Sequence, residues 1–305
     1  MRPQNMPALV DTVIYIIACV IIWLTSVIPI KCLAWAGRQM GRLAWHIDRR
    51  HRLVATRNIV AAFPELDPDD CLNLAKENFH RLGETYACIL KTGGMNAKQI
   101  KNVLTVEGYE RIEEIMMHDP KANIILAIGH YGNFELFSWI VLGAPSAQIV
   151  TTYRAIRQPK LNKLLLQLRA ASGCLYFERR TEGAQLKETM KRPHIMLGLL
   201  ADQNAGEGGL WLPVFGRETS VSSAPAVFAQ RYQCRLFPSA CFRISAGHWK
   251  IELGEEIPVK ENGQRRSTEA ITRDIIEAQE KTIRCDPANW FWVHNRWKPR
   301  QANNR

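Results

Sequence analysis

A histidine and a glutamate follow one apolar run at a spacing that suits proton transfer. The run 124–128 predicts a buried strand, His130 comes two residues after it, and Glu135 opens a predicted helix over 134–142. In parallel α/β sheets, ligands bind at the carboxyl ends of the strands. An imidazole beside a carboxylate can act as a general base, because the carboxylate fixes its tautomer and stabilises the imidazolium. No serine or cysteine lies between the two, so the pair favours deprotonation of a substrate hydroxyl over a covalent acyl-enzyme. A capped helix start with a hydrogen-bonded histidine is the alternative.

Three further polar side chains accompany predicted elements in the same region. Arg169 lies in an otherwise apolar helix predicted over 160–171, so a buried guanidinium there needs an anion, either a substrate phosphate or a site carboxylate. It could also stabilise oxyanion charge, or simply complement a helix C-terminus. Asp202 and Gln203 follow a predicted strand over 195–200 and belong at the functional edge of the sheet.

Weaker candidates for substrate contacts complete the expected site. Arg154 and Arg180 suit phosphate binding, although surface charges more often have no such role. Phe215 and Gly216 would lie beside an acyl channel or form an ordinary buried turn. The full set of expected substrate contacts is Asn133, Arg154, Arg180, Gln203, Phe215 and Gly216. Glycines 206, 208 and 209 indicate a flexible binding loop, since no GxGxxG or GK[ST] phosphate cradle is present.

The elements that must position these side chains alternate between short apolar runs and helical patterns. Such alternation predicts an α/β domain with a mostly parallel sheet flanked by helices. A long amphipathic helix begins at Asp67-Pro68 and is closed by Gly93-Gly94. Later strands are expected over 103–106, 124–128, 149–152, 175–177, 195–200, 235–242 and 249–253, with helices over 107–118, 134–142, 160–171, 182–191 and 267–284.

An uncharged apolar segment near the start predicts a membrane anchor. Residues 12–30 are nineteen residues without a charge, close to the roughly 20 needed to cross a bilayer. The segment could instead be a cleaved signal peptide ending near Ala34-Trp35-Ala36. Six arginines between 38 and 57 favour a retained anchor, spanning or re-entrant, with the body on the cytoplasmic side. We therefore expect an anchor over 1–36 and a catalytic domain over 37–305.

Composition narrows the class of protein. The 305 residues are 47% hydrophobic with a net charge of +11, which excludes a disordered chain. Eight scattered cysteines without a CxxC pair indicate reduced thiols in the cytosol and no structural zinc. The basic cluster lacks interleaved aromatic residues, so an anionic membrane surface is expected as its partner and nucleic acid is not. A second basic patch, expected to face an acidic donor, comprises Arg296, Lys298, Arg300 and Arg305.

Several motifs along nearly the whole chain resemble one family. His130-x4-Glu135 resembles the His-x4-Asp/Glu motif of the bacterial lipid A late acyltransferases, which is shared with the wider glycerolipid acyltransferases. Arg57-Asn58-Ile59 with Phe63-Pro64-Glu65 resembles the RNL…FPE stretch of that family. The resemblance continues through Tyr153-Arg154, Asp202-Gln203 and Pro213–Gly216. The ending from Pro287 to Lys298 looks like its more specific PEQYxWxHxRFK pattern.

The resemblance implies a reaction and roles for individual residues. It implies O-acylation of a lipid hydroxyl by a fatty acyl thioester, usually on acyl carrier protein, with no metal or redox cofactor. His130 would be the base and Glu135 its partner, while Arg169 and Asp202 match the arginine and aspartate of the family. A glycolipid, and among glycolipids a lipid A precursor, is the expected acceptor, and the donor could be acyl carrier protein or coenzyme A. The alternatives are a transferase for another lipid or carrier-bound acceptor, and a non-catalytic basic lipid-binding membrane protein.

Overall fold

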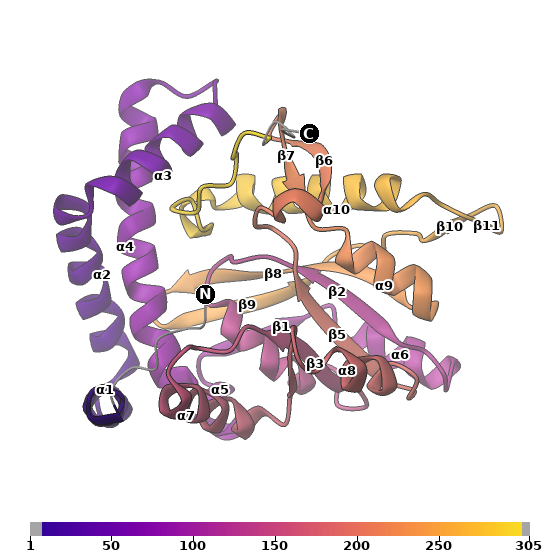
Figure 1. The fold of residues 1–305 in the computed structure, drawn as a ribbon, viewed down its shortest axis with the longest axis horizontal. Helices are drawn as coiled ribbons and strands as arrows, with labels where there is room; N and C mark the ends of the chain where they lie inside the picture. Colours follow the sequence, from indigo (N-terminus) through magenta and orange to yellow (C-terminus); the bar gives the residue numbers. More distant parts are fainter. Residues whose placement is uncertain (1–7, 301–305) are drawn as a thin grey trace.

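A computed structural model describes residues 8–300 and shows a central seven-stranded sheet (Figure 1). The strand order is β1-β9-β8-β2-β5-β3-β4, and every neighbouring pair is parallel except β8 with β9. The strands are β1 (Leu104–Glu107), β2 (Ile124–Ile128), β3 (Gln148–Tyr153), β4 (Leu175–Glu178), β5 (Ile195–Leu200), β8 (Arg235–Ser245) and β9 (His248–Leu253). The predicted α/β class with a mostly parallel sheet is therefore confirmed.

Helices cover both faces of this sheet because the central strands are apolar on both sides. In β2, Ile124, Leu126 and Ile128 face one cluster, and the alternate residues Ile125 and Ala127 face another. On the first face pack α5 (Ala97–Ile100), α6 (Glu110–His118) and the 3-10 helix η1 (Phe134–Leu142). On the second face pack α8 (Gly183–Thr189), α9 (Ala224–Tyr232) and α10 (Thr268–Cys285).

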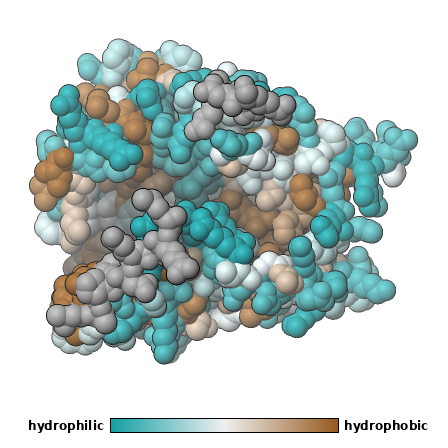
Figure 2. Space-filling model, in the orientation of Figure 1, coloured by the Kyte–Doolittle hydropathy of each residue, from teal (hydrophilic) through white to brown (hydrophobic). Residues whose placement is uncertain are grey.

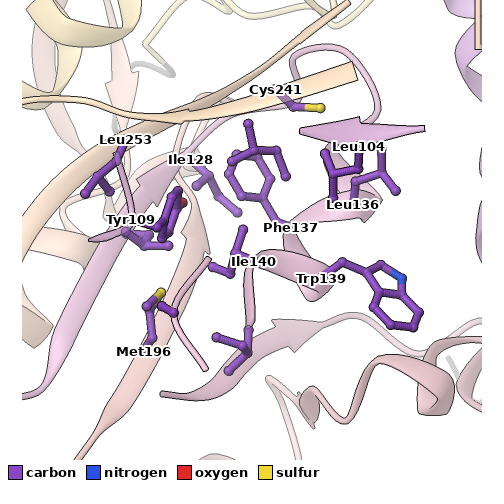
Figure 3. Packing of buried hydrophobic residues seen from close by; sticks show 14 of the residues in the cluster. Leu104, Tyr109, Ile128, Leu136, Phe137, Trp139, Ile140, Met196, Cys241 and Leu253 are labelled. Carbon is purple, nitrogen blue, oxygen red and sulfur yellow. The ribbon is translucent and has the colours of Figure 1, made fainter. Parts of the chain in front are cut away.

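The segment that leaves β2 is anchored in the first of these clusters. Figure 3 shows Phe137 and Ile140 of η1 projecting among Ile128, Tyr109 and Leu253. The predicted helix over 134–142 is thus present, but its hydrogen bonds are of the tighter 3-10 type. Because η1 is buried, the short connection that precedes it, which carries His130, is held at both ends.

A layer of helices stands beside the sheet. It contains α2 (Ile30–Ile47), α3 (Arg49–Ala62) and α4 (Pro68–Thr92), and α2 runs along α4 (Figure 1). A Cβ on Gly41 would meet the carbonyl oxygen of Phe79 at 2.2 Å, and one on Gly83 would meet that of Gly37 at the same distance. Glycine is therefore required for this close approach of two helix backbones. The predicted start of α4 is confirmed, since Asp67 caps it through the backbone N–H of Asp70.

The apolar N-terminal segment forms α1 (Ala8–Val27), which α7 (Pro159–Arg169) and α4 contact. Within α1, Val10–Val27 is long and apolar enough to cross a membrane, and only 6% of it is buried. Pro29 separates α1 from α2. The expected boundary at residue 36 falls inside α2, whose first turns already pack with the body of the protein.

Two small hairpins were not expected from the sequence. One consists of β6 (Leu210–Val214) and β7 (Arg217–Val221), preceded by a 3-10 turn η3 (Gly206–Gly208); the other consists of β10 (Lys260–Glu261) and β11 (Gln264–Arg265). Two more 3-10 turns, η2 (Ala170–Ser172) and η4 (Pro287–Asn289), follow α7 and α10. All eight cysteines are free thiols.

Candidate active site

His130 and Asp202 meet at the carboxyl ends of two adjacent strands. His130 follows β2 and Asp202 follows β5, which pairs with β2 in parallel. The ring Nδ1 of His130 lies 2.8 Å from Asp202 Oδ1, and the backbone N–H of His130 donates to Oδ2 at 2.7 Å. A Cβ on Gly129 would lie 3.2 Å from Oδ2, so the glycine leaves room for this contact. Asp202 therefore holds both the backbone and the ring of the histidine.

This contact fixes the chemistry of the imidazole. With Nδ1 donating to a carboxylate, Nε2 carries the lone pair and can accept a proton from a substrate. The imidazole is partly exposed and lies between two aromatic rings, with centroids 4.8 Å from Phe134 and 5.9 Å from Phe291. The amide nitrogen of Gln203 lies 3.5 Å from Nε2, on the side where a substrate would bind. The structure thus brings the predicted residues Asp202 and Gln203 to His130.

The charge of Asp202 stabilises the protonated form of His130, as a general base requires. Burial by itself would lower the pKa of His130, but the charge and hydrogen bond of Asp202 outweigh it, so the pKa lies above its usual value. Burial would raise the pKa of Asp202, yet His130 and the hydrogen bonds to the carboxylate lower that pKa to about 2. Asp202 is therefore ionised at neutral pH.

Glu135 does not fill the position expected for it. Its carboxylate pairs with Arg169 instead: Nε of the guanidinium donates to Oε2 at 3.0 Å and Nη2 to Oε1 at 2.5 Å. Glu135 reaches His130 only through its charge, which contributes to the raised pKa of the imidazole. The expectation that Glu135 is the hydrogen-bonded partner of His130 is corrected here, and Asp202 takes that position. The reason is the strand order, because β5 lies directly beside β2.

Arg169 has the buried anion partner that its apolar helix required. It ends α7, and its guanidinium carbon lies 5.0 Å from the ring centre of Tyr176. Burial would lower the pKa of Arg169, but Glu135 raises it above the usual value. The remaining nitrogen, Nη1, is buried and has no hydrogen-bond partner among the described residues. One donor is thus left for a substrate or a water molecule.

A cavity of about 60 Å³ opens beside the Glu135–Arg169 pair. Its lining includes the polar side chains of Glu135, Ser138 and Arg169, together with apolar side chains of the sheet and η1, which include Leu126, Ile128, Phe137, Ile140 and Ile149. The cavity therefore offers an apolar space bounded in part by Phe134, whose ring contacts that of His130.

The sequence analysis did not identify Trp290 as part of this site. Its indole Nε1–H donates to Asp202 Oδ2 at 2.9 Å, and the ring is buried. Two buried amides position the segment that carries it. Asn78 of α4 donates to the carbonyl oxygens of Ala288 and Trp290. The motif pattern Trp290-x-Trp292-Val293-His294 was the available signal, but it gave no hint of the aspartate as its partner.

The motif segments near the two ends of the chain, residues 57–65 and 287–298, contact each other close to Trp290. Asn58 of the Arg57-Asn58-Ile59 stretch donates to the carbonyl oxygens of Trp292 and His294 at 2.9 and 2.8 Å. Phe63 packs on Trp292 with ring centroids 5.7 Å apart. The C-terminal segment therefore passes close to α4 and reaches the active site (Figure 1).

Three of the expected substrate contacts have other surroundings. Asn133 is fully buried, and its amide donates to Thr92 Oγ1 at 3.3 Å, away from the open side of His130. Phe215 and Gly216 form the β6–β7 turn with φ of 47° and 70°. Phe215 packs against Phe63 and Trp292, with no contact to the cavity beside Glu135. We therefore correct these three expectations: Asn133 and Phe215 are packed inside the protein, and Gly216 is an exposed turn residue.

Arg154 and Arg180 lie side by side at the carboxyl edge of the sheet. Arg154 directly follows β3 and Arg180 comes two residues after β4, and the strand ends Tyr153 and Glu178 are paired in register. Both arginines are exposed, as are Arg157 and Arg179 beside them. Among residues 8–300, none of the four guanidinium groups has an ion pair to a carboxylate. They form an arginine cluster open to an anion, on the same edge as His130.

The expected C-terminal basic patch is smaller than predicted. Arg296 is only 3% exposed, and its Nη1 donates to the Ser220 carbonyl at 2.5 Å. The side chain therefore links the C-terminal segment to β7 and is not part of the surface. Burial also lowers its pKa to about 10. Lys298 and Arg300 are exposed, and Arg300 stacks over Trp211 at 5.5 Å. Arg305 lies outside the described residues.

The arrangement as a whole supplies a base, its anionic partner, a nearby fixed cation and an apolar cavity. No group of three or more His, Cys, Asp or Glu side chains within residues 8–300 is placed to hold a metal ion. The site can take a proton from a hydroxyl at Nε2 and can accommodate an apolar chain beside it. This combination suits acyl transfer to an alcohol.

Comparison with known families agrees with this chemistry. The family model described as bacterial lipid A biosynthesis acyltransferase matches residues 3–299, which is nearly the entire chain. A search of curated proteins finds no match.

Proposed function

Because the chain belongs to the bacterial lipid A biosynthesis acyltransferase family, we propose that it moves a fatty acyl chain from an acyl thioester to a hydroxyl of a lipid A precursor. Membership of the family makes it an acyltransferase of lipid A synthesis. The observation that carries the finer proposal is the 2.8 Å contact between His130 Nδ1 and Asp202 Oδ1, which leaves the lone pair of the partly exposed imidazole on Nε2.

The proposed reaction follows from that geometry. Nε2 of His130 takes the proton of the acceptor hydroxyl as its oxygen attacks the thioester carbonyl carbon. The imidazolium so formed is stabilised by the ionised Asp202. When the tetrahedral intermediate collapses, the carbon–sulfur bond breaks and Nε2 returns the proton to the departing thiolate. The products are an ester and a free thiol.

Glu135 and Arg169 are assigned to the substrate side of this step. Arg169 lines the cavity and its Nη1 has no hydrogen-bond partner within residues 8–300, so it can donate to an oxygen of the bound acyl thioester. Glu135 holds the guanidinium in place through two hydrogen bonds. The apolar part of the cavity would take the part of the acyl chain nearest the carbonyl. We expect the arginine cluster that includes Arg154 and Arg180 to bind a phosphate of the acceptor.

The proposal places the enzyme at the bacterial inner membrane, with its catalytic domain on the cytoplasmic side. The apolar helix α1 would be the anchor, and the basic residues that follow it favour the cytoplasmic side. Acyl carrier protein is the proposed donor, because the exposed basic residues Lys298 and Arg300 suit an acidic carrier.

Lipid mass spectrometry tests this function. In a strain lacking the protein, lipid A should lose one ester-linked acyl chain, and the purified protein should restore that chain in vitro from an acyl carrier protein thioester. Unchanged lipid A with a missing chain on another lipid would instead support the alternative of a transferase for a different acceptor.

A further inference from the structure

Helix α2 presents three different faces, and only one is used inside the protein. The inner face packs on α4 through Gly37 and Gly41, where an added Cβ would meet α4 backbone atoms at 2.5 and 2.2 Å. Such close backbone contact fixes the rotation of α2 about its own axis. The outer faces therefore cannot turn inward to hide their side chains.

One outer face is an apolar strip. It consists of Cys32, Ala36, Met40, Leu43 and Ile47, which are spaced by three and four residues and so align along one side of a helix. The large members are far from buried: Met40 is 68% exposed, Leu43 61% and Ile47 72%. Trp35, 65% exposed, lies on the adjacent face, four residues after Lys31 and four before Gln39. Hydrophobic surface is visible in Figure 2 on the left edge, where Figure 1 places α2.

The other outer face is basic and polar. It carries Lys31, Gln39, Arg42 and His46, and α3 then begins with Arg49 and Arg50. Residues 12–47 contain no aspartate or glutamate. A helix whose exposed half divides into an apolar strip and a basic strip has the pattern of helices that lie in the interface of an anionic bilayer. A protein partner would not require this absence of acidic residues over the whole stretch.

The position of α2 continues the proposed membrane anchor. It begins three residues after α1 ends, and Lys91 of α4 donates to the carbonyl oxygens of Thr25 and Ser26 at the end of α1, at 3.1 and 2.8 Å. The same helix α4 thus holds both the end of α1 and the length of α2. A bilayer that receives α1 necessarily lies close to the first turns of α2.

We propose that α2 is a second membrane contact, with its apolar strip immersed at the headgroup–acyl boundary of an anionic leaflet and its basic strip against the phosphates. The inference rests on the membrane attachment through α1 proposed above. It gives α2 a part in function, because α2 packs on α4 and Asn78 of α4 holds the carbonyl of Trp290 in the active-site wall. The membrane contact would thereby set the position of that wall relative to the lipid surface that contains the acceptor.

Native cysteines provide the probes for a test on the full chain. Cys32 lies on the strip, Cys19 lies in α1, and Cys285 is exposed at the end of α10, while the other five thiols are buried. Three variants would each keep one of these three cysteines and have serine at the other two. Each would carry an environment-sensitive fluorophore and be reconstituted in phosphatidylglycerol–phosphatidylcholine vesicles that contain a doxyl-lipid quencher. We expect strong quenching at Cys19 and Cys32 and none above background at Cys285.

Paired substitutions make the test specific to the strip. Met40→Gln with Leu43→Gln should reduce quenching at Cys32 at least twofold, whereas Gln39→Ser with His46→Gln on the polar face should leave it unchanged. Quenching at Cys19 with none at Cys32 would overturn the role of α2 and leave the anchor intact. Absence of quenching at both would overturn the anchor as well. Efficient cross-linking of two chains through Cys32 would assign the strip to a second copy instead and contradict the proposal.

Discussion

The indole N–H of Trp290 donates to Oδ2 of Asp202 at 2.9 Å, while Oδ1 of the same carboxylate faces the ring of His130. A side chain near the end of the chain thus holds the aspartate that orients the base. Within residues 8–300, Asp202 accepts three hydrogen bonds, two of them from His130. The relationship explains why the C-terminal Trp/His/Arg pattern belongs to the active site.

Trp290→Phe tests this relationship, because it removes the indole donor and keeps an aromatic ring. Without that hydrogen bond, the carboxylate should interact more strongly with the imidazolium, so the pKa of His130 should rise further. We expect the acidic limb of kcat/KM to move to higher pH, with a loss of roughly 10-fold at neutral pH from one charged hydrogen bond. The control is Trp292→Phe, since Trp292 donates to the Pro287 carbonyl. It should lower the melting temperature without moving the limb.

The pH profile itself follows from the raised pKa of His130. The base must be neutral to accept a proton, so kcat/KM should rise with pH and level off only above the usual pKa of histidine, about 6.5. In Asp202→Asn, burial remains and the attracting charge is lost, so the pKa of His130 should fall below that value. We expect the acidic limb of the kcat/KM profile to move to lower pH. The value at the plateau should fall by about 10⁴-fold, as for a base that has lost its orienting carboxylate. An acidic limb at the same pH as in the parent would contradict the pairing of His130 with Asp202.

Coupling between residues should follow the hydrogen bonds and not the sequence motif. The double variant His130→Ala/Asp202→Ala should have a kcat/KM little below that of either single variant, because the effects of residues that work as a unit are non-additive. The reductions in kcat/KM caused by Glu135→Gln and by Arg169→Gln should likewise be non-additive with each other. If His130→Ala instead showed its strongest coupling with Glu135→Gln, the division into two pairs would be wrong.

The strands and their edges were predictable from the sequence, but the pairings across the site were not. β2 and β5 have the predicted bounds, because each is an uncharged, mostly apolar run that begins after a polar residue and ends at or just before a glycine or a charged residue. The chain passes through β3 and β4 before β5, so nothing local shows that β5 returns to lie beside β2. That return brings Asp202 to His130 and leaves Glu135 to Arg169. The burial of Arg296 likewise depends on the β6–β7 hairpin, whose two strands were not expected on either side of the possible turn at Phe215-Gly216.

The two exposed basic residues near the C-terminus are expected to steer the donor. Lys298→Gln with Arg300→Gln should raise the KM for acyl carrier protein thioesters more than for the matching coenzyme A thioester. Rising salt should narrow the difference from the parent, since exposed charges are screened beyond about 8 Å at physiological ionic strength. Lys260→Gln with Arg265→Gln on the β10–β11 hairpin removes the same charge elsewhere on the surface and should leave both KM values unchanged. If the variant raised the KM equally for both donors at every salt concentration, Lys298 and Arg300 would have a structural role instead.

Topology can be checked at the exposed turn of the β10–β11 hairpin. Asn262→Cys, in a variant with serine at Cys32 and Cys285, should resist a membrane-impermeant maleimide applied to intact cells and react once the cells are permeabilised. The basic residues after α1 are the physical reason, because they oppose translocation. Labelling in intact cells would contradict a cytoplasmic body and favour the cleaved signal peptide.

The most direct measurement of the central claim is the rate at which purified His130→Ala acylates a lipid A precursor from an acyl carrier protein thioester. The account predicts a fall of about 100- to 10,000-fold relative to the parent, the range for loss of a general base. Circular dichroism and the melting temperature should stay close to those of the parent, because the imidazole is partly exposed at the edge of the sheet. Turnover within a few-fold of the parent, with the fold intact, would contradict His130 as the base.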